Sequence, residues 1–280
     1  MRQLLSALVL AAVLMAAQGV RAAPAVEIRN AVARVVVSPE PRADIEVEVV
    51  RADPRLPLRI WRFAGRTFID GGLGRRVRTC STQNGEPSAK VAGVGVVAYQ
   101  AMPQVIVHTP LQARVYVMGG DAVWGRVGRS QTLDFANAGC GEWRLGDVSG
   151  RMKVSVAGAG GVRAGQASEA ELYADGAGSI LAGAVAHGVY AMNLGSGQIQ
   201  IASVSGPFTA RIAGAGSVRA AEGRVSTMQA EVAGSGGISF DGVAGALTAS
   251  VHGSGDVTVA RVTGPVRKAI VGSGTVRVGS

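Results

Sequence analysis

Aromatic side chains are scarce in this 280-residue chain, where phenylalanine, tyrosine and tryptophan together make up 4% of the residues. Surfaces that bind single-stranded nucleic acid set aromatic side chains among basic ones, and no such cluster occurs in this sequence. The low aromatic content also argues against a lectin-like face built from aromatic platforms. The sequence therefore predicts no nucleic-acid partner.

Long hydrophobic runs are equally rare, and the run near the N-terminus is too short for a membrane anchor. It extends from Leu4 to Ala17, after Met1-Arg2, and is followed by Val20-Arg21-Ala22. A basic start, an apolar run and a small-residue cleavage motif are typical of a secretory signal peptide. We therefore expect residues 1–22 to be removed on export. The mature protein is expected in the periplasm or at the cell surface, and not as an integral membrane protein.

Cysteine is limited to Cys80 and Cys140. In an exported protein, an even pair of cysteines predicts a disulfide. Closing a loop of about 60 residues would stabilise the fold by roughly 4 kcal/mol in the chain-entropy model. The alternative is a metal-binding or nucleophilic thiol, but the sequence has no CxxC spacing and no histidine near either cysteine.

Glycine, in contrast, is abundant, with 41 residues. A Gly-x-Gly motif followed two residues later by a bulky apolar residue recurs at steps of 18 to 20 residues, and its copies begin at Gly139, Gly158, Gly176, Gly195, Gly214, Gly234, Gly253 and Gly272. A fixed period of this length is the signature of a solenoid. Frequent glycine also opposes a helical repeat, since each glycine in a helix interior costs about 1 kcal/mol relative to alanine.

Each repeat contains apolar residues at alternating positions, which predicts strands with one buried face. Three such stretches fit into one period, so we expect an all-β, parallel β-helix with three short strands per turn of about 19 residues. The turn is not divided into three matched hexapeptides, which favours a right-handed helix. Gly150, Gly206, Gly245 and Gly264 are expected at corners where φ is positive.

The chain before Gly139 has the alternation without the glycine period. We expect residues 23–138 to form irregular first turns of the same β-helix, with a loop near residues 75–92, and residues 139–280 to form the regular repeats. A separate small β domain is the alternative for the N-terminal part.

The run Gly139-Cys-Gly-Glu-Trp143, preceded by Asp70-Gly-Gly72 and Cys80, resembles the head GIN domain family of autotransporter-type adhesins. The likeness covers nearly the whole mature chain. It implies an exported β-helical protein that acts as an adhesin, and it brings no catalytic residues to carry over.

Residues for catalysis do not gather in a recognisable motif. The three histidines, at positions 108, 187 and 252, have no Asp or Ser at a recurring spacing, so no catalytic triad is predicted. Glu142 and Asp256 hold equivalent repeat positions six turns apart, or roughly 29 Å, too far for two carboxylates to act on one bond. We expect no catalytic residue, cofactor or metal site, and no enzyme.

The formal net charge is +9, from 28 basic and 19 acidic residues. Arginine recurs at one outward position of the repeat, as Arg144, Arg163, Arg219 and Arg277. Stacked on one face, these side chains would form a stripe suited to an anionic polymer of the cell envelope, because the guanidinium group pairs with carboxylate or phosphate through two hydrogen bonds. The alternative is a face that is simply solvated.

Two classes of function follow. The first is an adhesin or binding module of the bacterial cell envelope, with an anionic polymer or a protein as its partner. The second is a structural or assembly protein of the periplasm whose solenoid ends stack. A polysaccharide-active β-helix enzyme is less favoured than either class. Because the segment 272–280 opens a further turn, we expect its end to be an interface for a second copy or a partner, with Val276 and Val278 at its centre.

Overall fold

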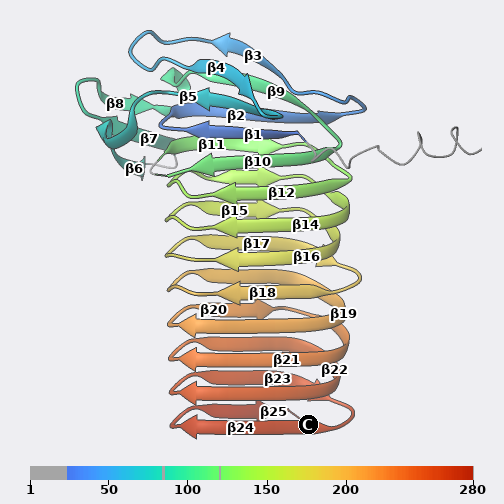
Figure 1. Ribbon diagram of the computed structural model, residues 1–280. Coiled ribbons are helices and arrows are strands. Elements are labelled where there is room, and N and C mark those ends of the chain that lie inside the picture. The colour runs from blue at the N-terminus through green and yellow to red at the C-terminus, as the bar shows by residue number, and fades with distance from the viewer. Residues whose placement is uncertain (1–23, 84–85, 120, 280) are drawn as a thin grey trace, which may run out of the picture.

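The computed structural model describes residues 24–83, 86–119 and 121–279, so the predicted signal peptide lies outside the described residues. The chain winds into a column of stacked parallel coils (Figure 1), which confirms the predicted all-β parallel solenoid. In Figure 1 the near strands run to the left and the far strands to the right as the chain descends, so the coils are right-handed. Among the described residues the helical elements are two 3-10 turns, η1 (Gly74–Arg76) and η2 (Tyr99–Ala101).

One side of the column is a parallel ladder that we call ladder A. Its first strands pair in the order β9, β2, β11 and β13. The ladder consists of β9 (Gln104–Pro110), β2 (Val32–Glu40), β11 (Ala122–Val127), β13 (Trp143–Leu145), β15 (Gly161–Ala164), β17 (Ser179–Val185), β19 (Gln198–Gly214), β20 (Ser217–Ala220), β22 (Gly237–Gly253), β23 (Asp256–Val262) and β25 (Thr275–Val278).

The opposite side is ladder B, which is also parallel from β5 onward. Its strands are β5 (Arg66–Asp70), β1 (Ala25–Arg29), β10 (Gln112–Met118), β12 (Thr132–Asn137), β14 (Val148–Val156), β16 (Ala167–Ala174), β18 (Val189–Asn193), then β19, β21 (Gly223–Gly234), β22 and β24 (Val266–Gly272).

A third, short ladder connects the two, as in the pairs Val148↔Ala167 and Val185↔Val204. Each regular coil therefore contributes to three ladders, as the sequence predicts. In β19 and β22 the segments merge into single strands of 17 residues.

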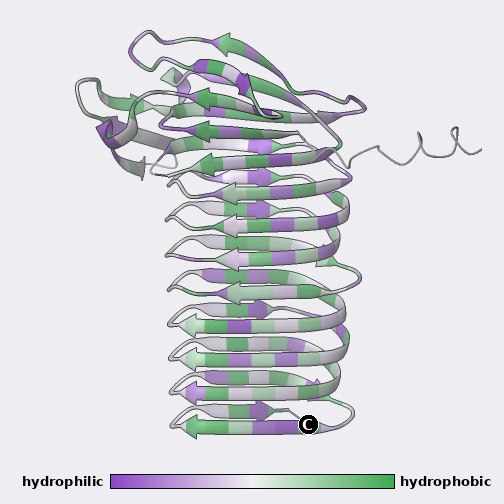
Figure 2. Ribbon diagram, in the orientation of Figure 1, coloured by the Kyte–Doolittle hydropathy of each residue, from purple (hydrophilic) through white to green (hydrophobic). Residues whose placement is uncertain are grey.

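The interior is a continuous apolar core between ladders A and B. Figure 2 shows hydrophobic and hydrophilic residues alternating along the strands, as expected when one face is buried. The core is filled by small residues together with a few large, fully buried ones, which include Trp143, Phe135, Phe208 and Phe240. Stacking coils at about 4.8 Å gives each layer an apolar neighbour above and below.

The Gly-x-Gly turns pack backbone against backbone. A Cβ on Gly197 would lie 2.1 Å from the carbonyl oxygen of Gly178, and one on Gly216 would lie 2.6 Å from that of Gly197. At the opposite corner φ is positive at Gly206 (83°) but not at Gly150, Gly245 or Gly264. The expectation of positive φ at all four corners is therefore wrong at three of them. Glycine is needed there because a Cβ would lie 2.3 to 2.8 Å from a carbonyl oxygen of the preceding coil.

The first coils do not follow chain order. Strands β1 and β2 lie between the coil formed by β5 and β9 and the coil formed by β10 and β11. Two antiparallel strands cover this end of the column, β3 (Glu46–Arg51) against β9 and β4 (Arg59–Phe63) against β5. Ladders A and B thus run without a break from the regular repeats into the N-terminal part.

A small antiparallel sheet projects beside the first coils (Figure 1), and we call it the flap. It consists of β6 (Val77–Gln83), β7 (Glu86–Val91) and β8 (Gly95–Ala98). The sequence predicts a loop near residues 75–92, whereas most of this segment is strand. Its polar side chains hide the strand pattern, because one face of the flap is exposed. The other face packs on the outside of ladder A in a second apolar cluster that contains Val91, Val97 and Trp124.

Candidate functional site

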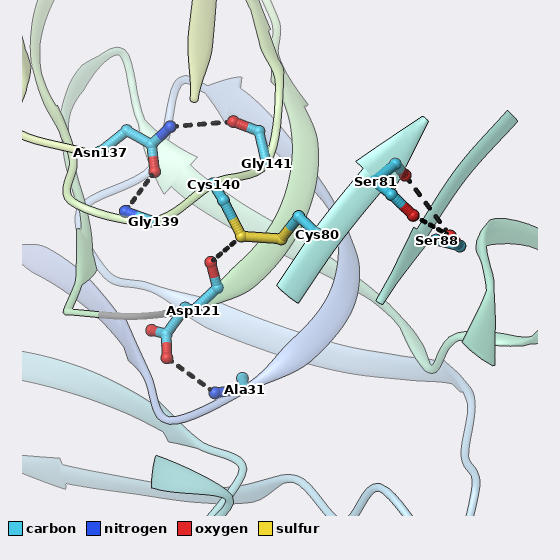
Figure 3. The surroundings of a disulfide bond; sticks show 9 residues. All are labelled: Ala31, Cys80, Ser81, Ser88, Asp121, Asn137, Gly139, Cys140 and Gly141. Atoms are coloured by element: carbon cyan, nitrogen blue, oxygen red, sulfur yellow. Dashed lines mark hydrogen bonds between the residues drawn. A yellow bond between two sulfur atoms is a disulfide. The ribbon is translucent and has the colours of Figure 1, made fainter. Parts of the chain in front are cut away.

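The flap is joined covalently to the first regular turn. Cys80 on β6 and Cys140 form a disulfide with a Cα–Cα distance of 5.9 Å (Figure 3), which confirms the predicted pair. Cys140 occupies the middle of the first Gly-x-Gly turn, two residues before Glu142 on the outer face of ladder A. The disulfide therefore holds the flap against that face.

Two buried asparagines brace the turns from inside. Asn137 donates to the carbonyl of Gly141 (3.0 Å) and accepts from the amide of Gly139 (3.1 Å), as Figure 3 shows. Asn193 makes the equivalent bonds three coils further along, and its Nδ2 lies 2.7 Å from the carbonyl oxygen of Gly197. Because buried polar groups must be paired, these side chains fix the turns in place.

Asp121 is a buried carboxyl group beside the disulfide, with 1% of its surface exposed. Its Oδ1 accepts from the amide of Ala31 (3.0 Å), while Oδ2 has no hydrogen-bond partner among the described residues. Burial raises the pKa of Asp121 from 3.8 to about 8, and the negative charge of Asp70 acts in the same direction. The folded protein therefore favours the protonated carboxyl group.

This raised pKa predicts a specific loss of stability with pH. Because the folded state holds the Asp121 proton more tightly than the unfolded chain, the contribution of Asp121 falls as the pH rises from 3.8 to about 8. Asp121→Asn keeps an oxygen acceptor for Ala31 without the charge. We expect the variant to melt at a higher temperature than the wild type at pH 9. Parallel plots of melting temperature against pH for the two proteins would contradict this.

The predicted arginine stripe is only partly continuous. Arg144 and Arg163 are register partners on β13 and β15, and Arg126 on β11 precedes them in the same column. Leu181 and Gln200 then separate Arg163 from Arg219. We call Arg126, Arg144 and Arg163 the arginine run.

The two other predicted arginines lie apart from this run. Arg219 Nη2 lies 2.6 Å from Asp241 Oδ2 in an ion pair. Arg277 is separated from Arg219 in the column by Ser239 and Thr258. The structure thus brings together two of the four predicted residues and adds Arg126, which lies before the glycine period and carries no repeat signal.

A pocket of about 500 Å³ opens where the arginine run meets the flap, and we call it the flap pocket. It lies between the outer face of β2, β11 and β13 and the segments that contain Pro87 and Tyr99. The polar side chains that line it are Arg34, Gln104, Arg126, Glu142 and Arg144. Two arginines of the run therefore also form a wall of the pocket.

Arg34 is the partly buried arginine of this pocket. Its guanidinium carbon lies 5.2 Å from the ring centroid of Tyr99, a cation–π contact. Its Nε is buried and has no hydrogen-bond partner among the described residues. Within the same described ranges, neither Arg34 nor any arginine of the run forms an ion pair within 4.0 Å. The pocket therefore has an excess of positive charge, with three arginines and one glutamate on its lining.

The histidines lie far from this site and from one another. His108 contacts Glu40 (2.6 Å), and His187 contacts Ser168 (2.9 Å) in a groove of about 690 Å³ along the short ladder. His252 lies 3.4 Å from Ser250. In the part of the chain that the structure describes, no group of three His, Cys, Asp or Glu side chains could hold a metal ion.

The last coil bears on the predicted end interface. Val276 and Val278 are partly buried against the core, whereas Val266, Ile270 and Val271 on β24 are exposed. An interface at this coil stays a prediction.

No helix within the described residues has the length and apolar character needed to cross a membrane.

Comparisons with known proteins add two structural likenesses. No family model matches the chain, so the resemblance to the GIN family stays a prediction, and no curated protein matches either. A candidate lipid-binding protein from Parabacteroides distasonis is similar over 93% of this chain and 95% of its own, with 17% identity and a TM-score of 0.48. A candidate adhesin from Bacteroides fragilis is similar over 92% and 93%, with 12% identity and a TM-score of 0.45.

Proposed function

We propose that this chain is an exported binding module of the bacterial cell envelope, of the adhesin type, that holds an anionic polymer on the outer face of ladder A. The observation that carries the proposal is the arginine run, in which three arginines stack in register on consecutive coils without an ion-pair partner within the described ranges. Neighbouring coils place these side chains about 4.8 Å apart. Such spacing allows successive acidic groups of one polymer to be bound together.

The rigid solenoid supports this function. Arg126 and Arg144 alternate with the inward residues Val127 and Leu145, which are buried in the core. The strands hold their positions before any ligand arrives, so binding orders only the ends of the arginine side chains. The proposal uses positive charge and spacing alone and requires no catalytic residue.

The test is a charge-matched pair of triple variants. Arg126→Gln, Arg144→Gln and Arg163→Gln together remove three charges from ladder A. The control removes three charges from ladder B on the opposite side of the column, by Arg114→Gln, Lys153→Gln and Arg211→Gln. Binding to polygalacturonate and to lipopolysaccharide would be measured by isothermal titration calorimetry at two salt concentrations.

We expect the ladder A variant to bind at least one of the two polymers about tenfold more weakly, with a flatter dependence on salt, because exposed charge pairs are screened by salt. The ladder B control should bind as the wild type does. Equal losses in the two variants would show a general charge effect, and wild-type binding by the ladder A variant would contradict the proposal.

A further inference from the structure

We propose that the flap pocket binds one sugar unit that carries a carboxylate or phosphate group, with Arg34 as the residue that recognises the anionic group. The inference rests on the proposed function for the source of this unit, which is the end of the polymer held by the arginine run. The pocket, its charge and its shape are independent of that source.

Arg34 brings to the flap pocket a guanidinium group that forms no ion pair within the described residues. Its side chain lines the flap pocket, and its buried Nε has no partner among the described residues. A carboxylate or phosphate group can accept two hydrogen bonds from one guanidinium group at once, in the paired geometry that arginine favours. An anion in the pocket therefore gives the Arg34 charge a partner.

The charge balance also favours an anion. Arg34, Arg126 and Arg144 line the pocket with a single acidic residue, Glu142. Tyr99 covers one side of the Arg34 guanidinium in a cation–π contact and also lines the pocket. Positive charge in a partly enclosed space attracts anions more strongly than the same charge on an open surface.

The size and remaining polar groups indicate a ligand larger than a bare ion. The volume of about 500 Å³ falls in the range of small-molecule sites. Gln104 and Glu142 can accept hydrogen bonds from hydroxyl groups, and both lie on the lining with the arginines. One sugar unit with an acidic group offers both kinds of partner.

The end of the charged column explains why the pocket takes a terminal unit. Beyond Arg126 the same column continues with Val36 and then Ile106. An acidic polymer that follows the run therefore finds no further cation in this column past the pocket. On the other side, Arg163 continues the run away from the flap.

The experiment measures binding of small probes to the full chain by calorimetry. The probes are galacturonic acid, its uncharged methyl ester, glucose 1-phosphate and inorganic phosphate. The variants are Arg34→Gln and Arg144→Gln in the pocket, with Arg224→Gln on the exposed surface of β21 as the control. Arg144 is exposed, so its variant preserves the fold even if Arg34→Gln does not. Melting temperature and near-ultraviolet circular dichroism report folding.

We expect one of the two acidic sugars to bind the wild type at least about tenfold more tightly than the methyl ester and inorganic phosphate. Each folded pocket variant should lose about tenfold in affinity, while Arg224→Gln stays within about twofold. No binding of either acidic sugar, or equal binding by Arg144→Gln, would overturn the inference. Failure of polymer binding with retained sugar binding would refute the proposed function alone.

Discussion

Replacing Cys140 by serine is expected to lower the free energy of unfolding by about 4 kcal/mol, the chain-entropy value for a loop of this length. The disulfide closes a loop of 60 residues, which includes most of the flap and strands β9, β10, β11 and β12. Without it, the unfolded chain gains conformational freedom while the folded chain keeps its strand ladders. Denaturant titration of the oxidised wild type and of Cys140→Ser measures the difference.

Loss of the disulfide should also destabilise the flap locally, in addition to lowering the free energy of unfolding of the whole chain. Cys80→Ser is the matched control and should give the same change, because either replacement removes the same bond. Hydrogen exchange in the flap strands β6, β7 and β8 should accelerate in both variants. Exchange in the distant strands β21 and β22 should stay as in the wild type under native conditions. An unchanged free energy of unfolding in either variant would refute the stapling role.

Replacing Gly197 by alanine is the second change with a large expected effect. The new Cβ would lie 2.1 Å from the carbonyl oxygen of Gly178, and its three nearest neighbours are all backbone atoms of the preceding coil, so no side-chain adjustment relieves the clash. Separating the two coils weakens the hydrogen bonds and apolar contacts of the ladder. We expect a loss of about 3 kcal/mol in the free energy of unfolding, as for severe overpacking.

The neighbouring residue supplies the control for this prediction. Ser196 lies between the two glycines of the same turn and is exposed. Ser196→Ala should change the stability by less than about 0.5 kcal/mol, the usual range for surface positions. Similar melting temperatures for Gly197→Ala and the wild type would show that the turns are not in backbone contact.

The solenoid could be predicted because the glycine period in the sequence has a direct structural cause. The second glycine of each motif is required by a carbonyl oxygen of the preceding coil, so the period of the glycines equals the length of the coil. The inward and outward alternation then placed Arg144 and Arg163 in one column. In a solenoid, residues one period apart in the sequence become neighbours on adjacent coils. Folds without repeats have no such rule.

The flap pocket could not be predicted for physical reasons that specific residues show. Arg126 lies in a coil where Asp121 and Val123 take the places of the two glycines, so no motif marks its register. Arg34 reaches the site because β2 is inserted between coils out of chain order. Trp124 points outward and is covered by the flap in the second apolar cluster. The alternating strand pattern shows that Trp124 is an outward residue, but not that the flap covers it.

The central claim is that an anionic polymer lies along ladder A, and hydrogen exchange with and without polygalacturonate or lipopolysaccharide tests it most directly. The account predicts slower exchange in β11, β13 and β15, which carry the arginine run, when the polymer that binds is present. Exchange in the ladder B strands β12, β16 and β18 should not change. Protection confined to ladder B, or no protection in the arginine-run strands at a polymer concentration that saturates binding, would contradict the account.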